Sequence, residues 1–363
     1  MRHPRPLRLG LNLGYWGAGN DAENLVLAQE AERLGFSSVW AAEAYGSDAA
    51  TVLSWVAAQT TRIDVGSAVF QIPARTPAMT AMTAATLDTL SGGRFRLGLG
   101  VSGPQVSEGW HGVRFDKPLA RTREYVSIVR AALARETVRY DGEFWTLPLP
   151  DGPGKALRLT VHPVRDCLPL YLAAIGPKNL ELAGEIADGW LAIFFAPEHA
   201  GDLIGRVAAG RATAGLGLDG FDVVPTVPLV VGTGSGANSP EALEECAAPL
   251  RPYTALYVGG MGSREQNFYN KLAVRMGYEE AAGTIQHLYL DRKPREAAAA
   301  VPFALIDQTS LIGTKARIRD RLAAYAEAGV TTLSVAPQGV TRQDRLASLR
   351  ALAEALDESG LGE

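Results

Sequence analysis

The sequence has few of the residues that build disulfide frameworks and metal sites. Its 363 residues include only two cysteines, Cys167 and Cys246, and five histidines. Two cysteines cannot form a disulfide framework, which suits a reducing compartment. Neither residue type shows the short, regular spacing of metal ligands, because the histidines lie at positions 3, 111, 162, 199 and 287. We therefore expect no metal centre.

Long apolar runs and an excess of charge of one sign are also absent. No stretch approaches the roughly 18 apolar residues that a membrane-spanning helix needs, and no signal-type apolar core precedes the first strand-like segment. The formal net charge of −4 gives no electrostatic reason to bind nucleic acid. The composition fits a cytoplasmic enzyme with neither nucleic acid nor membrane as a partner.

What is present is a regular alternation of strand-like and helix-like segments. Short apolar runs typical of buried strands are separated, in most cases, by amphipathic helical patterns such as 76–90 and 118–135. Eight such strands predict a (β/α)₈ barrel, with an open doubly wound sheet as the alternative. The two prolines of the seventh run weaken that assignment. The runs are 7–14, 38–45, 63–71, 94–101, 170–175, 189–195, 221–231 and 331–337.

Two segments interrupt this alternation. Residues 138–167 are rich in Pro and Gly and predict a long loop or small hairpin, and residues 233–302 begin with a Gly/Ser run and continue with helical stretches. Neither has the length and pattern of an independent core. We therefore interpret residues 1–363 as a single domain with two insertions.

One strand-to-helix corner attracts attention because of its residue types. The stretch "LYLAAIGPKNLELAGEIADGW" (170–190) passes from an apolar strand to a helical pattern through Gly176, Pro177 and Lys178. Gly and Pro are common punctuation between such elements. The same arrangement also suits an anion at a helix N-terminus, because little side chain shields the first backbone amides. The residues alone leave both interpretations open.

A second motif, "GLGVSG" (98–103), satisfies the glycine spacing of dinucleotide-binding folds. That fingerprint also requires the glycine loop to open a helix in the first βαβ unit. Here Pro104 follows, the next residues show no apolar helical face, and the motif lies in the fourth unit. We therefore reject the nucleotide interpretation and retain only a strand end that something approaches closely.

In a (β/α)₈ barrel the chemistry occurs at the carboxyl ends of the strands. The residues predicted there are mostly aromatic or small, with few ionisable groups and no nucleophile–base or carboxylate pair. Such a mouth suits an enzyme whose cofactor carries the chemistry. The predicted residues are Tyr15, Trp16, Glu43, Tyr45, Ala68, Val69, Phe70, Gln71, Val101, Ser102, Gly103, Ile175, Gly176, Pro177, Lys178, Phe194 and Phe195.

The motifs resemble those of the bacterial luciferase-like superfamily. The segments "GSAVFQIPARTP" (66–77), "SGGRFRLGLGVSG" (91–103) and "AAIGPK" (173–178) followed by "ELAGEIADGW" (181–190) carry the resemblance. They are most similar to the branch of coenzyme F420-dependent oxidoreductases that includes methylenetetrahydromethanopterin reductase and the F420-dependent glucose-6-phosphate dehydrogenases. The similarity covers roughly the whole chain and is strongest over 9–190.

The resemblance implies roles for several strand-end residues. A non-proline cis peptide would join Ala68 to Val69 and back the deazaflavin ring. Glu43 would hydrogen-bond the head of the cofactor, and Gln71 would be placed to reach it. The loop after the fourth predicted strand, Val101, Ser102 and Gly103, would complete this side of the cofactor site.

The resemblance also decides between the two interpretations of the corner. In relatives the loop after the fifth strand binds the cofactor phosphate through backbone amides. Gly176 leaves room for such a group, Pro177 presets the first helical turn, and Lys178 adds positive charge. The implied phosphate site is Ile175, Gly176, Pro177, Lys178 and Asn179.

Two departures from the sugar-phosphate dehydrogenases are equally informative. Those relatives carry a histidine directly after the second-strand acid, where this chain has Ala44, and a glutamate where it has Gly103 or Pro104. The acid/base pair of that chemistry is therefore missing, and glucose 6-phosphate is rejected as substrate. The proton donor or acceptor stays unassigned, with Glu43, Tyr15, Tyr45, Glu108 and His111 as candidates, the last favoured as a packing residue.

These inferences predict a coenzyme F420-dependent oxidoreductase that transfers hydride between the deazaflavin and a small organic substrate. Reduction of an activated C=C, C=N or C=O is favoured over alcohol oxidation. The alternatives are an FMN-dependent luciferase-like monooxygenase and a non-catalytic flavin-binding barrel. The resemblance also implies a homodimer, for which the apolar helix 76–90 is one candidate interface. Within the second insertion, Arg264, Asn267, Tyr269 and Lys271 are candidates to face the cofactor tail or substrate.

Overall fold

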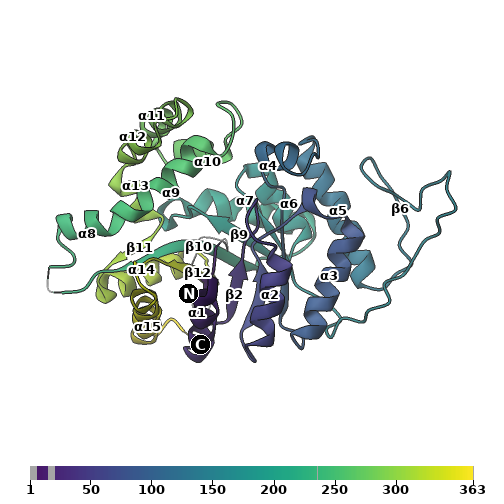
Figure 1. Ribbon diagram of the computed structural model, residues 1–363, viewed down its shortest axis with the longest axis horizontal. Helices are drawn as coiled ribbons and strands as arrows, with labels where there is room; N and C mark the ends of the chain where they lie inside the picture. Colours follow the sequence, from purple (N-terminus) through teal and green to yellow (C-terminus); the bar gives the residue numbers. More distant parts are fainter. Residues whose placement is uncertain (1–5, 15–20, 235, 363) are drawn as a thin grey trace.

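A computed structural model describes residues 6–14, 21–234 and 236–362 of the chain (Figure 1). Within them, eight parallel strands close a barrel, because β1 pairs with both β2 and β12, and β10 pairs with both β9 and β12. The predicted (β/α)₈ barrel is confirmed. Around the barrel the strands are β1 Arg8–Asn12, β2 Ser38–Ala41, β3 Asp64–Ser67, β5 Phe95–Gly100, β8 Leu170–Ala173, β9 Gly189–Ile193, β10 Asp222–Val231 and β12 Thr332–Pro337.

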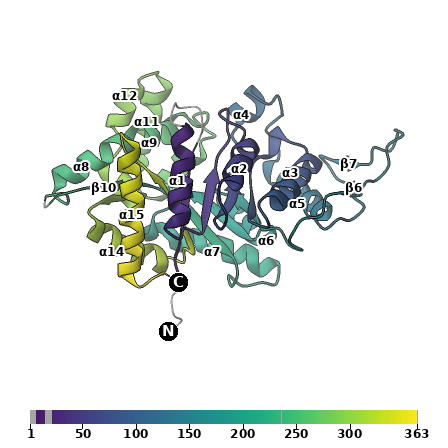
Figure 2. The ribbon, with the colours of Figure 1, turned by 60° about the horizontal axis from the view of Figure 1, so that its bottom comes forward.

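Each barrel strand is followed by a helix that packs on the outside. Figure 2 shows α15 beside α1, so that helices from the two ends of the chain are neighbours. None of the helices within the described residues is long and apolar enough to cross a membrane. The outer helices are α1 Asp21–Arg33, α2 Ala49–Ala58, α3 Pro77–Leu90, α5 Pro118–Leu133, α6 Pro177–Ile186, α7 Ala200–Thr213, α14 Lys315–Glu327 and α15 Arg342–Ser359.

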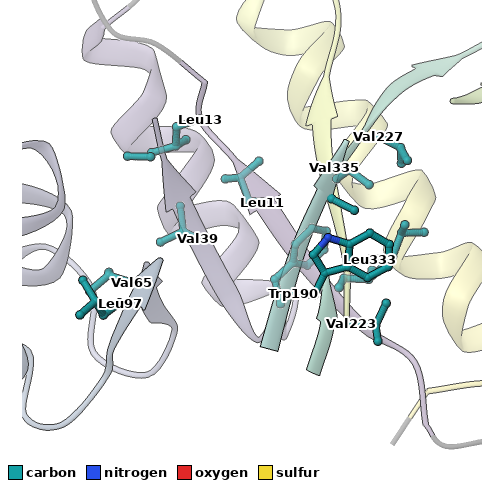
Figure 3. Packing of buried hydrophobic residues seen from close by; sticks show 14 of the residues in the cluster. Leu11, Leu13, Val39, Val65, Leu97, Trp190, Val223, Val227, Leu333 and Val335 are labelled. Carbon is teal, nitrogen blue, oxygen red and sulfur yellow. The ribbon is translucent and has the colours of Figure 1, made fainter. Parts of the chain in front are cut away.

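Side chains alternate between the inside of the barrel and the layer between strands and helices. In β5, Phe95, Leu97 and Leu99 belong to the outer hydrophobic cluster, whereas Arg96 lies among polar groups inside. Figure 3 shows part of the outer cluster along the strands. A smaller inner cluster contains Trp40, Tyr171, Leu191 and Val224, with Ala68, Val69 and Ala173 packed against it.

Strand β10 continues through both of its prolines, so the doubtful seventh strand is confirmed. Its ladder with β9 ends at Thr226, where its ladder with β12 begins. Pro225 therefore precedes one ladder and Pro228 follows the other. Proline is tolerated because each ring lies beside a stretch in which only one neighbouring strand is paired.

The structure adds elements that periodicity did not predict. Strand β11 (Leu311–Gly313) pairs with β10 outside the closed barrel and is too short to show a strand pattern. The predicted run 63–71 is divided into β3 and β4 (Phe70–Gln71), and β4 pairs with β5. The residues after Gly103 show no apolar helical face, yet they form a short helix, α4 (Pro104–Gly109). Six residues are too few to show an amphipathic repeat.

The first insertion contains a small antiparallel hairpin, β6 (Tyr140–Asp141) and β7 (Thr146–Leu147), within a loop that projects from the barrel (Figure 1). The second insertion is helical and has a hydrophobic cluster shared with Ile175, Phe194 and Val230 at the ends of barrel strands. The single-domain interpretation stays a prediction. The helical elements are α8 Pro240–Ala247, α9 Arg251–Ala255, a π-helical turn Leu256–Gly260, α10 Phe268–Arg275, α11 Glu279–Leu290 and α12 Pro294–Ala299, followed by α13 Phe303–Gln308.

Candidate active site

The closed barrel brings the predicted site residues to its carboxyl-terminal rim, because all eight strands run in one direction. Glu43 and Ala44 follow β2, Gln71 ends β4, and Ser102 follows β5. Tyr15 and Trp16, the residues expected after β1, lie outside the described residues.

The carboxylate of Glu43 is buried and takes part in a dense set of contacts with the chain's own donors. Arg75 donates to both of its oxygens, from Nη1 to Oε2 at 2.7 Å and from Nη2 to Oε1 at 2.6 Å. The backbone N–H groups of Ala49 and Gln71 donate to Oε1 at 3.2 Å and to Oε2 at 3.1 Å. Arg75 was not among the residues predicted for the site. A cation following a strand end in "IPARTP" was the available signal.

The side chain of Gln71 connects two loops of the rim. Its Nε2 donates to the carbonyl oxygen of Ala44 at 2.7 Å, and its Oε1 accepts from the Ser102 hydroxyl at 2.9 Å. Both partners have left-handed backbone, with φ of 89° at Ala44 and 62° at Ser102. Non-glycine residues adopt this region only where the surroundings hold them there. Gln71 provides such a contact to both loops.

The peptide bond between Ala68 and Val69 is cis, as predicted. Both side chains are partly buried against the inner cluster around Trp40 and Tyr171. A Cβ on Gly100 would lie 2.5 Å from Cγ2 of Val69, so the glycine makes room for this side chain. Ala68 and Val69 therefore stand directly above the packed interior of the barrel.

The corner after β8 has the predicted form. Gly176 is the N-cap of α6, Pro177 is its first residue, and a Cβ on Gly176 would meet no atom within 4 Å. The amides of Asn179 and Leu180 both donate to the Gly176 carbonyl. Two amides of the first turn of α6 are therefore already used within the corner itself.

A residue from the second insertion reaches the same corner. Arg275 of α10 donates from Nη2 to the Ile175 carbonyl oxygen at 3.0 Å, and desolvation lowers the pKa of its guanidinium although Asp202 opposes that shift. The side chain borders a cavity of about 270 Å³ that also contacts Phe194 and the start of α7. Sequence reasoning did not predict Arg275, because it is 100 residues from its partner.

An aromatic cluster joins the end of β9 to the second insertion. The ring of Phe194 lies 5.6, 5.5 and 6.1 Å from those of Tyr253, Tyr257 and Tyr269, centre to centre. Two of the tyrosines come from α9 and the π-helical turn, and the third from α10. Tyr269 was a candidate to face cofactor or substrate, and it lies in this cluster beside a strand end.

The other candidates of this insertion differ in environment. Asn267 is buried, and its Nδ2 donates to the carbonyl oxygens of Tyr257 and Val258 while its Oδ1 accepts from the first amides of α10. It links the π-helical turn to α10. This role is apparent only from the folded structure of the insertion. Arg264 and Lys271 are exposed.

The candidate proton donors and acceptors differ in the same way. The Tyr45 side chain is 64% exposed at the rim. Glu108 lies on α4, where it accepts from the amide of Phe115 at 3.0 Å. The Nε2 of His111 is buried and has no hydrogen-bond partner among the described residues. Within residues 6–14, 21–234 and 236–362, no group of three or more His, Cys, Asp or Glu side chains is arranged to hold a metal ion.

Comparison with known proteins shows which family has this sequence and architecture. The sequence model of the luciferase-like monooxygenase family matches residues 14–332. The chain belongs to the luciferase-like monooxygenase family. It is 43% identical over 350 residues, covering 94% of this chain and 99% of the relative, to a Mycobacterium tuberculosis protein named "putative coenzyme F420-dependent oxidoreductase".

More distant members of the family share the fold. The chain is 29% identical over 304 residues to 5,10-methylenetetrahydromethanopterin reductase of Archaeoglobus fulgidus, covering 83% of this chain and 85% of that one. The structure of the coenzyme F420-dependent tetrahydromethanopterin reductase from Methanopyrus kandleri superimposes with a TM-score of 0.78 at 24% identity, covering 96% and 97% of the two chains. The family resemblance predicted from the motifs is therefore confirmed.

Proposed function

We propose that this family member is a coenzyme F420-dependent oxidoreductase of the cytoplasm. The observation that carries the proposal is the similarity to the Mycobacterium tuberculosis protein, which extends over nearly the full length of both chains and bears an F420-dependent name. The rim is consistent with it, because it presents small, aromatic and backbone groups with few ionisable side chains. Such a site binds and orients a cofactor that carries the chemistry.

The rim fits a deazaflavin with a phosphate-bearing tail. Ala68, Val69, Val101, Ser102 and Gly103 would line the ring side, above a barrel interior that is already filled with side chains. The open corner of Ile175, Gly176, Pro177, Lys178 and Asn179 would hold the phosphate, next to the guanidinium of Arg275. When bound, the deazaflavin supplies a hydride donor or acceptor at its C5 position.

The substrate we propose is a small organic electrophile with an activated C=C, C=N or C=O bond, which is reduced. The motivating observation is the backbone role of Ala44, whose carbonyl is held by Gln71 where sugar-phosphate dehydrogenases carry an acid/base histidine. The wild-type enzyme is expected to oxidise reduced F420 in the presence of such an electrophile. Oxidation of simple alcohols with F420, abolished in a Glu43→Gln variant, would instead indicate a dehydrogenase.

The decisive experiment is a pair of fluorescence titrations of the apoprotein, with F420 and with FMN. Micromolar or tighter binding of F420 alone supports the proposal. Preference for FMN would favour the alternative, a luciferase-like monooxygenase, which the family name keeps in view. Lys178→Ala and Arg275→Ala should each weaken F420 binding about two- to fivefold, whereas Lys155→Ala in the first insertion should not change it.

We further propose that the protein is a homodimer that uses the outer face of α3. Met79 and Met82 are about half exposed on one side of this helix, at 51% and 50%. Exposed methionines at this spacing form an apolar stripe suited to a contact with another chain. Sedimentation of the wild type and of a Met79→Lys, Met82→Lys variant tests this, since a monomeric wild type would contradict it.

A further inference from the structure

The Glu43 carboxylate at the end of β2 receives as many hydrogen bonds from the chain as a carboxylate can accept. Glu43 and Arg75 have side chains only 6% and 13% exposed, and both Glu43 oxygens accept one guanidinium N–H and one backbone N–H. A carboxylate offers about four lone-pair sites. Four donors therefore saturate it, which leaves no acceptor for the head of a cofactor.

Arg75 is held from three further sides. Its guanidinium also pairs with Asp48 at the start of α2 and lies 4.5 Å from the centre of the Phe70 ring. Its backbone oxygen accepts from the Tyr125 hydroxyl at 3.2 Å. A bidentate guanidinium–carboxylate pair fixes direction as well as charge. The arginine is therefore preorganised before any ligand binds.

A chain of hydrogen bonds connects Glu43 to two loops of the rim. Its Oε2 holds the amide of Gln71, and the Gln71 side chain holds the carbonyl of Ala44 and the hydroxyl of Ser102. Both of those residues have left-handed backbone. Two loops that lie on either side of β4 are thus tied to one glutamine, which is itself placed by the ion pair.

We propose that Arg75 is a positioning residue for the cofactor site. It holds Glu43 as a structural carboxylate that fixes Gln71 and, through it, the Ala44 and Ser102 loops, and Glu43 does not itself contact the deazaflavin. The identity of the bound ring rests on the proposed function, but the coupling between the ion pair and the two loops belongs to the apoprotein.

The test is a double-mutant cycle of Glu43→Gln, Arg75→Met and the double variant. Each single variant is expected to raise the dissociation constant of F420 about tenfold, and the double variant to raise it no further, because both act on one unit. Amide hydrogen exchange of the apoprotein should accelerate over Ala44 and Ser102 in all three variants. At saturating cofactor, the pH profile of turnover in the three variants should keep the same number of limbs as that of the wild type. Arg75→Lys, which retains the positive charge but not the bidentate geometry, should restore part of the affinity.

A matched pair at the opposite end of the barrel provides the control. Arg165 pairs with the fully buried carboxylate of Asp88 near the start of β5, so Arg165→Met should perturb folding stability without changing F420 binding or exchange at the rim. The proposal is overturned if Glu43→Gln removes a limb of the pH profile while Arg75→Met leaves turnover unchanged, or if the two losses of affinity add.

These outcomes remain distinct from failure of the proposed function. A wild-type protein that binds FMN but not F420 would refute the cofactor assignment. Hydrogen exchange would still test the coupling: unchanged exchange at Ala44 and Ser102 in folded Arg75→Met or Arg75→Lys would refute the positioning role.

Discussion

The indole of Trp40 occupies the space in which Gly66 would carry a side chain. A Cβ on Gly66 would lie 2.4 Å from two atoms of the six-membered ring of Trp40, which is fully buried inside the barrel. The pair shows how the interior is filled: one large ring is accommodated by a glycine on the neighbouring strand. The barrel interior beneath the rim is therefore closely packed.

Gly66→Ala should destabilise the protein by about 1–3 kcal/mol, because the ring cannot move within a close-packed interior. Gly205→Ala on α7 is the matched control, because a Cβ there meets no atom within 4 Å. It should stabilise the fold by about 0.5–1 kcal/mol, as expected for glycine in an exposed helix. Urea unfolding of both variants measures the difference. Equal stabilities would show that the interior relaxes around the new methyl group.

A polar network closes the other end of the barrel. Arg96 donates to Asp64 at 2.7 Å, to Asp222 at 3.1 Å and to the Tyr171 hydroxyl at 2.8 Å. Its side chain is 12% exposed, and burial beside Asp222 raises the pKa of the Tyr171 phenol above its usual range. Arg96 pairs with both carboxylates, and Asp222 has a second ion-pair partner in the partly exposed Arg8.

Arg96→Met should therefore lower the free energy of unfolding by about 3 kcal/mol, because Asp64 loses its ion pair and Asp222 keeps only the partly exposed Arg8. The surface pair between Arg206 and Glu181 serves as control, and Arg206→Met should leave the unfolding midpoint unchanged. Chemical unfolding at neutral pH compares the two. A small effect of Arg96→Met would mean that water enters this end of the barrel.

Glu30 connects α1 to α15 and should make stability depend on acid pH. Hydrogen bonds from Arg33 and Arg350 lower its pKa from 4.5 to about 2. Because the folded pKa is depressed, the contribution to stability is fully present above about pH 4.5 and is lost as the pH falls toward 2.

The gap in urea midpoint between wild type and Glu30→Gln should accordingly be largest near pH 7, and it should shrink between pH 4.5 and 2. High salt should also reduce it, since both arginines are about half exposed or more. A gap that stays constant across this range would contradict the depressed pKa.

Asn267 should control the order of the second insertion. It is 1% exposed, donates to two carbonyl groups of the π-helical turn and caps α10. Asn267→Ala should cost about 2 kcal/mol, because α10 loses its cap and the Tyr257 carbonyl loses its side-chain donor, whereas the Val258 carbonyl keeps Asn270. Ser239→Ala, which removes only the cap of exposed α8, should cost about 1 kcal/mol. Limited proteolysis should cleave 256–275 faster in Asn267→Ala alone. Equal cleavage of both variants would show that the insertion does not depend on this side chain.

Local sequence patterns determined much of this protein. Strand runs, helix caps and glycine stops are encoded within a few residues, so the eight barrel strands and the corner at Gly176 could be predicted from the chain itself. Family motifs added the cis bond at Ala68, because that feature follows residue order rather than distant packing.

Only the tertiary structure decided what the side chains at those positions touch. Glu43 meets Arg75, which is 32 residues away, Arg275 reaches Ile175 across 100 residues, and Arg96 meets Asp222 across 126. No short-range pattern encodes these pairs, because barrel closure brings strand ends together without regard to their separation along the chain. The sequence by itself therefore specified the barrel and marked its rim, whereas the closed fold determined which rim residues are satisfied by the chain and which remain open to a ligand.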